Sequence, residues 1–188
     1  MVWLIVIGIA FILFVVAELG DKTQLMTISL ASRYKHMPVF CGVFLGMALV
    51  TVLGITIGTI LYSYIPLKLL KIIAATIFIL FGVYTFFSKE EDTKTVLKDS
   101  HVFRNSFILS AVAEMGDKTQ FAVIGLTARY AAPLPVLIGS LLGLAFIIGI
   151  GVLFGKKLCE YVESKKIKIG TAILFIVIGS IFFAEVLL

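Results

Sequence analysis

A short polar motif occurs twice in this chain, and it carries residue types that bind cations. Residues 17–34 read AELGDKTQLMTISLASRY and residues 113–130 read AEMGDKTQFAVIGLTARY, so 11 of 18 aligned positions are identical. Each copy holds two acids and a lysine, which are Glu18, Asp21 and Lys22, and Glu114, Asp117 and Lys118. Apolar segments surround both copies, and a charge at the centre of a membrane-spanning helix costs about 2.5–3.5 kcal/mol. These side chains must therefore be paired, hydrated or bound to a ligand.

The spacing within each copy predicts a metal site built from oxygen ligands. The two acids are three residues apart and share a face in helical geometry, and a glutamine three residues further on extends that face. The neutral oxygens near the acids belong to Gln24, Gln120, Thr23 and Thr119. If the two copies meet, four carboxylates and these oxygens converge, a ligand set suited to Ca²⁺, Mn²⁺ or Mg²⁺. No histidine or cysteine accompanies the motif, which argues against zinc or copper.

The formal charge of such a site indicates what it could exchange. Four carboxylates with Lys22 and Lys118 as countercharges leave a charge of −2, which one divalent cation neutralises. When the cation leaves, protonation of carboxylates relieves their repulsion, so we expect two protons to replace one divalent ion. A structural alternative is that each lysine only neutralises its own helix, because Glu18–Lys22 and Glu114–Lys118 have the i,i+4 spacing of ion pairs.

The composition predicts a membrane protein. The chain has 188 residues, 61% hydrophobic and 14% charged, whereas soluble domains are about one quarter charged. Six apolar stretches are long enough to cross a bilayer, at 2–32, 38–64, 67–87, 104–128, 134–155 and 168–187. We therefore expect an all-α integral membrane protein with six transmembrane helices.

The two halves resemble each other beyond the motif. The glycines Gly42, Gly46, Gly54 and Gly58 recur as Gly139, Gly143, Gly151 and Gly155. We expect a first three-helix repeat at 1–87, a cytoplasmic linker at 88–103 and a second repeat at 104–188. Because three spans is an odd number, the second repeat must enter the membrane in the opposite sense, an inverted repeat typical of secondary transporters. We also expect the motif helices to be kinked or broken near Gly20 and Gly116.

The distribution of basic residues predicts the orientation. One face of the predicted bundle receives eleven lysines and arginines, and the other receives only Lys68, Lys71 and Arg129. The richer face should be cytoplasmic, which puts both termini outside the cytoplasm. The net charge of +5 then follows from the topology, and we expect no nucleic-acid partner.

The doubled motif resembles that of the Golgi cation/proton exchanger family (uncharacterised protein family sixteen), which includes bacterial manganese exporters. The matching strings are Glu18-Leu19-Gly20-Asp21-Lys22-Thr23 and Glu114-Met115-Gly116-Asp117-Lys118-Thr119. The resemblance implies transport of Mn²⁺ or Ca²⁺ coupled to protons, with the motif acids essential. The short linker is similar to that of bacterial members, which implies Mn²⁺ efflux across the bacterial inner (plasma) membrane.

We therefore interpret the chain as a secondary active transporter that exports a divalent cation, Mn²⁺ in preference to Ca²⁺, in exchange for protons. The metal ligands would be Glu18, Asp21, Glu114 and Asp117, assisted by Gln24 and Gln120. We expect no tightly bound cofactor; the partners would be the cation, protons, the lipid bilayer and, as a candidate, a second copy of the chain.

Other functions fit the sequence less well. An enzyme is disfavoured because the motif supplies no nucleophile–base pair. The main alternative is an exporter of cationic amino acids on a related inverted-repeat fold, in which the acids would face an ammonium or guanidinium group. A membrane scaffold that transports nothing is the remaining alternative.

Overall fold

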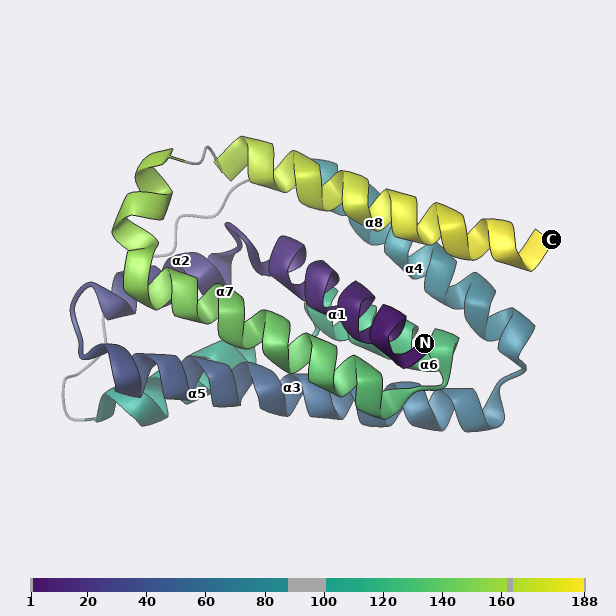
Figure 1. Cartoon of the computed structure of the whole chain (residues 1–188), viewed down its shortest axis with the longest axis horizontal. Helices are drawn as coiled ribbons and strands as arrows, with labels where there is room; N and C mark the ends of the chain where they lie inside the picture. Colours follow the sequence, from purple (N-terminus) through teal and green to yellow (C-terminus); the bar gives the residue numbers. More distant parts are fainter. Residues whose placement is uncertain (1, 88–100, 162–163, 188) are drawn as a thin grey trace.

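The computed structural model describes residues 2–87, 101–161 and 164–187, and these ranges form a bundle of eight helices without strands (Figure 1). The helices are α1 (Val2–Glu18), α2 (Lys22–Ala31), α3 (His36–Tyr64), α4 (Leu67–Phe87), α5 (Val102–Glu114), α6 (Lys118–Tyr130), α7 (Pro133–Tyr161) and α8 (Ser164–Leu187). The all-α class predicted from the sequence is confirmed for these ranges. Most of the predicted linker, residues 88–100, lies outside the described residues.

The helix that carries each motif copy is interrupted at a glycine. Between α1 and α2 the axis bends by 71°. Gly20 has a φ of 68° and Gly116, between α5 and α6, has a φ of 80°. This left-handed conformation costs a residue with a side chain about 1–2 kcal/mol, whereas glycine adopts it freely. The motif therefore ends one helix and starts the next within a few residues.

Among the described residues, three helical segments are long and apolar enough to cross a membrane, and the bent α1–α2 pair makes a fourth if it counts as one span. The three are His36–Tyr64, Lys68–Phe87 and Pro133–Phe154. The α5–α6 pair is divided by its break into helices of 13 residues each, and the apolar part of α8 in the described residues is the short segment Ala172–Ala184. The six-span arrangement stays a prediction.

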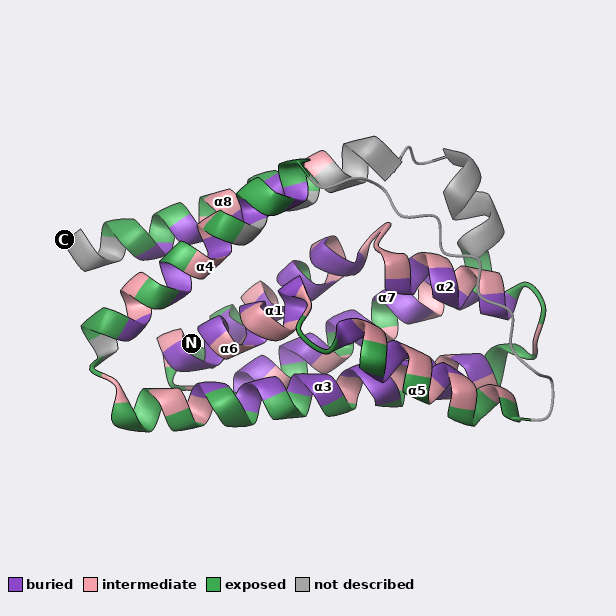
Figure 2. Ribbon diagram, turned by 180° about the vertical axis from the view of Figure 1, so that it is seen from behind, coloured by how far each residue is buried: buried purple, intermediate pink, exposed green. Residues whose placement is uncertain are grey.

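The outer faces of the bundle are apolar. Buried residues run along α1 and α6, whereas α4 and α8 carry exposed residues on their outer sides (Figure 2). In the middle of α3 the exposed large side chains follow helical spacing and are aliphatic: Leu45, Leu49, Val52, Leu53, Ile57 and Ile60. A continuous apolar stripe of this length is unfavourable in water and suits contact with lipid.

Each long central helix packs on the broken helix of the other half. On α3, a side chain at Gly42 would meet Phe103 and Ser106 of α5. On α7, a side chain at Gly139 would meet Ile7 and Ala10 of α1, which are the equivalent residues when the motif copies are aligned. The next glycine of each helix, one turn later, shows the same equivalence. A side chain at Gly46 would meet Phe107 and Ser110, and one at Gly143 would meet Phe11 and Phe14. The contacts between the halves are therefore reciprocal.

The equivalent helices also run in opposite directions. In Figure 1, α1 starts on the right and runs left, whereas α5 starts on the left and runs right. The same relation holds between α3 and α7, which pack together, and between α4 and α8. Phe78 of α4 fills the space between α4 and α8, with its ring centroid 5.5 Å from those of Phe175 and Phe182.

We expect the close approach of α3 and α5 to be sensitive to one methyl group. A Cβ at Gly46 would lie 2.1 Å from Ser110 Oγ and 2.5 Å from the backbone oxygen of Phe107, so Gly46→Ala must push the helices apart. We predict a loss of about 1–3 kcal/mol in the free energy of unfolding, measured in detergent. The matched control is Gly8→Ala on α1, where no atom lies within 4 Å of the new Cβ. Equal stability of the two variants would contradict this packing.

Candidate functional site

Three acids from the two motif copies meet inside the bundle. Oxygens of Glu18, Asp21 and Glu114 all lie within 4.8 Å of one another. Glu18 ends α1, Asp21 precedes α2 and Glu114 ends α5, so the two helix breaks bring these side chains together. The exposed fractions of Glu18 and Glu114 are only 1% and 2%. The convergence of motif copies that the sequence predicts is thus present for three of its four acids.

The fourth acid, Asp117, lies outside this group of three. It precedes α6 as Asp21 precedes α2, and both have extended backbone, with φ of −83° and −76° respectively. Its side chain is half-buried, and its Oδ2 has no hydrogen-bond partner among the described residues. In this conformation the two motif copies are therefore not equivalent, although their sequences are.

A lysine from the second half neutralises an acid from the first. Lys118 Nζ lies 2.5 Å from Asp21 Oδ1, and both side chains are largely buried. The sequence pattern instead allowed ion pairs within each helix, Glu18–Lys22 and Glu114–Lys118. The ion pair that the described part of the chain forms at this site joins the two halves instead. The alternative of separate, self-neutralised helices does not describe this arrangement.

Two threonines donate hydrogen bonds to the same carboxylate. Thr23 Oγ1 lies 2.5 Å from Glu114 Oε1, and Thr119 Oγ1 lies 2.6 Å from Glu114 Oε2. Each oxygen of Glu114 thus accepts one hydrogen bond, and the two donors come from different halves of the chain. Neither oxygen of Glu18 has a hydrogen-bond partner among the described residues. A buried charged oxygen without a partner is costly, so Glu18 is the acid with the strongest requirement for a ligand.

The two glutamines stabilise the helix breaks. Gln120 Oε1 accepts a hydrogen bond of 2.6 Å from the backbone N–H of Gly116, and Gln24 Oε1 accepts one from the N–H of Gly20. The structure thus shows a capping role that the sequence analysis missed, for which the Gly-x-x-x-Gln spacing in both copies was the available signal. Their assistance as metal ligands stays a prediction.

The charges at this site suit one divalent cation. With all groups ionised, three carboxylates and the Lys118 ammonium leave a formal charge of −2. The C-terminal ends of α1 and α5, at Glu18 and Glu114, add partial negative charge, whereas the N-terminal ends of α2 and α6, next to Asp21 and Asp117, add partial positive charge. Carboxylate oxygens with such a field match hard cations that prefer oxygen ligands.

The fold and the site define a helical membrane protein with a buried acidic cluster. A family model described as divalent cation/proton antiporter GDT1 matches residues 6–93 and 102–187. The chain belongs to this family of transporters, and the family is not one of enzymes.

Three relatives illustrate the match. The chain is 32% identical over 176 residues to the Vibrio cholerae protein named "Putative manganese exporter", covering 93% of this chain and 88% of that protein. It is 30% identical over 186 residues to GDT1-like protein sll0615 of Synechocystis sp., covering 87% and 89%. It is 32% identical over 232 residues to GDT1-like protein C186.05c of Schizosaccharomyces pombe, covering 94% and 88%. No solved structure matches the chain significantly.

We predict that the hydrogen bond between the halves, from Thr23 to Glu114, contributes measurably to stability. Thr23→Val removes a donor to a carboxylate and should lower the free energy of unfolding by about 1.5–3 kcal/mol. The matched control is Thr27→Val one turn later, because Thr27 is equally buried and donates only to the backbone oxygen of Thr23, at 2.7 Å. Unfolding in detergent measures both. If the control lost as much stability as Thr23→Val, the carboxylate would not depend on this donor.

Proposed function

We propose that this protein is a secondary active transporter that exports a divalent cation across the bacterial inner membrane in exchange for protons. Mn²⁺ is the favoured substrate, in line with the name of the Vibrio cholerae relative, and Ca²⁺ is the second candidate. The observation that carries the proposal is the group of Glu18, Asp21 and Glu114, whose oxygens lie within 4.8 Å of one another in an apolar bundle.

The cation would bind between the two halves. Glu18, Asp21 and Glu114 are its first ligands, and Asp117 joins them when α6 shifts toward the cluster. Gln24 and Gln120 assist through their amide groups while they hold the two breaks in place. Glu18 would be the principal ligand, because this buried carboxylate has no hydrogen-bond partner among the described residues.

Lys118 would act as an internal substitute for the transported cation. Its ammonium group is 2.5 Å from Asp21 Oδ1, so it neutralises a ligand that the metal also needs. Binding of the metal displaces Lys118, and its return helps release the metal. The aligned sequence position is Lys22, and in the opposite access state Lys22 would pair with Asp117 in the same way.

We also propose that the chain forms two inverted three-helix repeats, at 1–87 and 104–188, joined by a cytoplasmic linker at 88–103. The reciprocal glycine contacts and the opposite directions of equivalent helices support this arrangement (Figure 1). Both termini would lie outside the cytoplasm, as the distribution of lysine and arginine indicates. Rocking of one repeat against the other would expose the acids to each side of the membrane in turn.

Proton exchange would follow from the charge of the site. When the metal leaves, carboxylates that repel one another inside the bundle take up protons, and two protons replace the charge of one divalent ion. Protons then travel inward as the metal travels outward. The membrane's proton gradient would thus supply the driving force.

Transport by proteoliposomes tests the ligand assignment and the coupling together. An imposed pH gradient should drive Mn²⁺ against its own gradient, and a protonophore should abolish this movement. Glu18→Gln keeps the shape of the side chain but removes its charge, and we expect at least about a ten-fold loss of flux, since even partners of a metal ligand contribute 10- to 100-fold.

The control for that experiment is Ser140→Ala, which removes a buried hydroxyl of α7 outside the acidic cluster. We expect its flux to stay within about two-fold of the wild type, because this hydroxyl has no hydrogen-bond partner among the described residues and its removal leaves no partner unsatisfied. Wild-type flux in Glu18→Gln would rule out the ligand assignment. Flux that ignores the pH gradient would rule out proton exchange while leaving the cation site in place.

If Lys118 competes with the metal, its removal should strengthen metal binding, whereas removal of a ligand weakens it. Lys118→Met leaves Asp21 unpaired, so the metal-free protein should lose stability, by less than the roughly 3–5 kcal/mol of a fully buried pair. Mn²⁺ no longer competes with an ammonium group and should raise the unfolding temperature more than in the wild type. The exposed Lys68→Met on α4 is the control. Weaker stabilisation by Mn²⁺ in Lys118→Met would show that Lys118 is no competitor.

A further inference from the structure

A second polar feature lies away from the acidic cluster, where the turn between α2 and α3 meets the start of α5. A cleft of about 640 Å³ opens there. Its charged lining comes from both halves of the chain, with Arg33 and Lys35 from the turn and His101 and Arg104 from the start of α5. The proposed transport function uses the acidic cluster and gives this cleft no role.

The described lining of the cleft is basic. Among the residues that the structure describes, this lining also includes Tyr34, Pro38, Val102 and Phe103 and contains no aspartate or glutamate. In the described part of the chain, neither arginine forms a salt bridge, and both side chains are exposed. Three permanent positive charges around one hollow repel one another, which destabilises the empty cleft and favours an anion.

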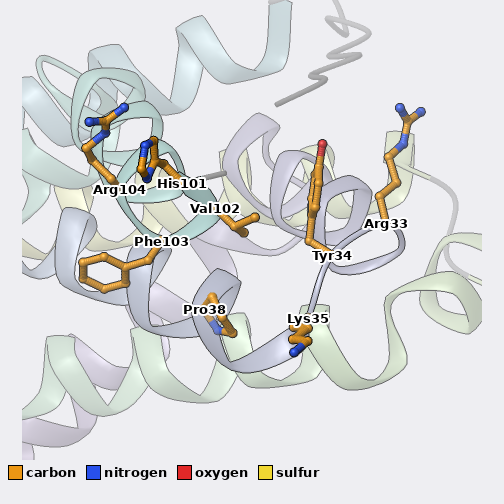
Figure 3. Close-up of a pocket in the computed structure, with 8 residues that line it drawn as sticks. All are labelled: Arg33, Tyr34, Lys35, Pro38, His101, Val102, Phe103 and Arg104. Carbon is orange, nitrogen blue, oxygen red and sulfur yellow. The ribbon is translucent and has the colours of Figure 1, made fainter. Parts of the chain in front are cut away.

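Basic side chains flank the cleft from both halves of the chain. In Figure 3 Arg104 and His101 lie on one side and Arg33 on the other, and their polar ends point in the same general direction. Arginine binds phosphate through two parallel N–H donors. The α5 helix also starts here, and His101 forms no side-chain cap, so its first N–H groups add to the positive field.

We propose that this cleft binds the phosphate group of an anionic ligand, and that a phospholipid headgroup is its source. Apolar residues lie beside the basic ones, since Phe103 and the neighbouring Met37 are exposed by 46% and 69%. A phospholipid could contact the basic residues with its headgroup and the apolar residues with its acyl chains, whereas a free phosphate ion could contact only the basic residues. The placement at the cytoplasmic interface, where anionic lipids gather, rests on the proposed orientation of the chain.

A bound headgroup would connect the two repeats. Arg33 follows α2 in the first repeat, and Arg104 lies in the first turn of α5 in the second. A phosphate held by both arginines links the ends of the two helices that carry the motif copies. The ligand would therefore favour the access state in which the two arginines are close.

Lipid binding by the purified full chain tests the proposal independently of transport. Native mass spectrometry would compare phosphatidylglycerol with phosphatidylcholine of the same acyl chains, with inorganic phosphate as a competitor. We expect saturable binding that prefers phosphatidylglycerol. Arg33→Gln and Arg104→Gln should each weaken it about five-fold, the contribution of one basic residue near an anionic lipid surface.

The matched control is Lys68→Gln, which removes one exposed positive charge from α4, outside the cleft. Its phosphatidylglycerol affinity should equal that of the wild type. Displacement of the lipid by millimolar inorganic phosphate would support the phosphate site but identify the free ion as its source. Equal affinities in the arginine variants and in Lys68→Gln would overturn the proposal. Because no flux is measured, this result is separate from that of the transport experiments.

Discussion

Carboxylates that lie close together inside an apolar bundle need positive charge or hydrogen-bond donors, and in this protein the opposite half of the chain supplies them. Asp21 of the first half depends on Lys118 of the second, and Glu114 of the second half depends on Thr23 of the first. Glu18 accepts no hydrogen bond from the described residues. The association of the halves and the demand for a cation thus have one electrostatic origin.

The backbone is arranged so that these groups can meet. Left-handed glycines at the two breaks end one helix and begin the next, which brings acids from a helix end and from a helix start into one place. The glutamines hold the breaks by accepting the glycine N–H groups. Glycines on α3 and α7 let each long helix approach the broken helix of the other half. Tight packing supports two discrete arrangements rather than continuous deformation, which is what the proposed alternating access needs.

Much of this could be predicted from the sequence, because the motif is duplicated and its charges stand in apolar surroundings. The helical class, the family and the meeting of Glu18, Asp21 and Glu114 all followed from that pattern. The sequence could not predict which lysine pairs with which acid, since Lys118 is four residues from Glu114 yet contacts Asp21. It also could not reveal that Asp117 stays apart, because two identical strings need not occupy equivalent positions in one conformation.

The central claim is that Glu18, Asp21 and Glu114 form one cation site that Lys118 occupies in the absence of metal. An experimental structure with Mn²⁺, located by its anomalous scattering, tests this claim most directly. The account predicts one Mn²⁺ in direct contact with these three carboxylates, with the Lys118 ammonium moved away from Asp21. A bound Mn²⁺ elsewhere in the protein, with the Lys118–Asp21 pair intact, would contradict it.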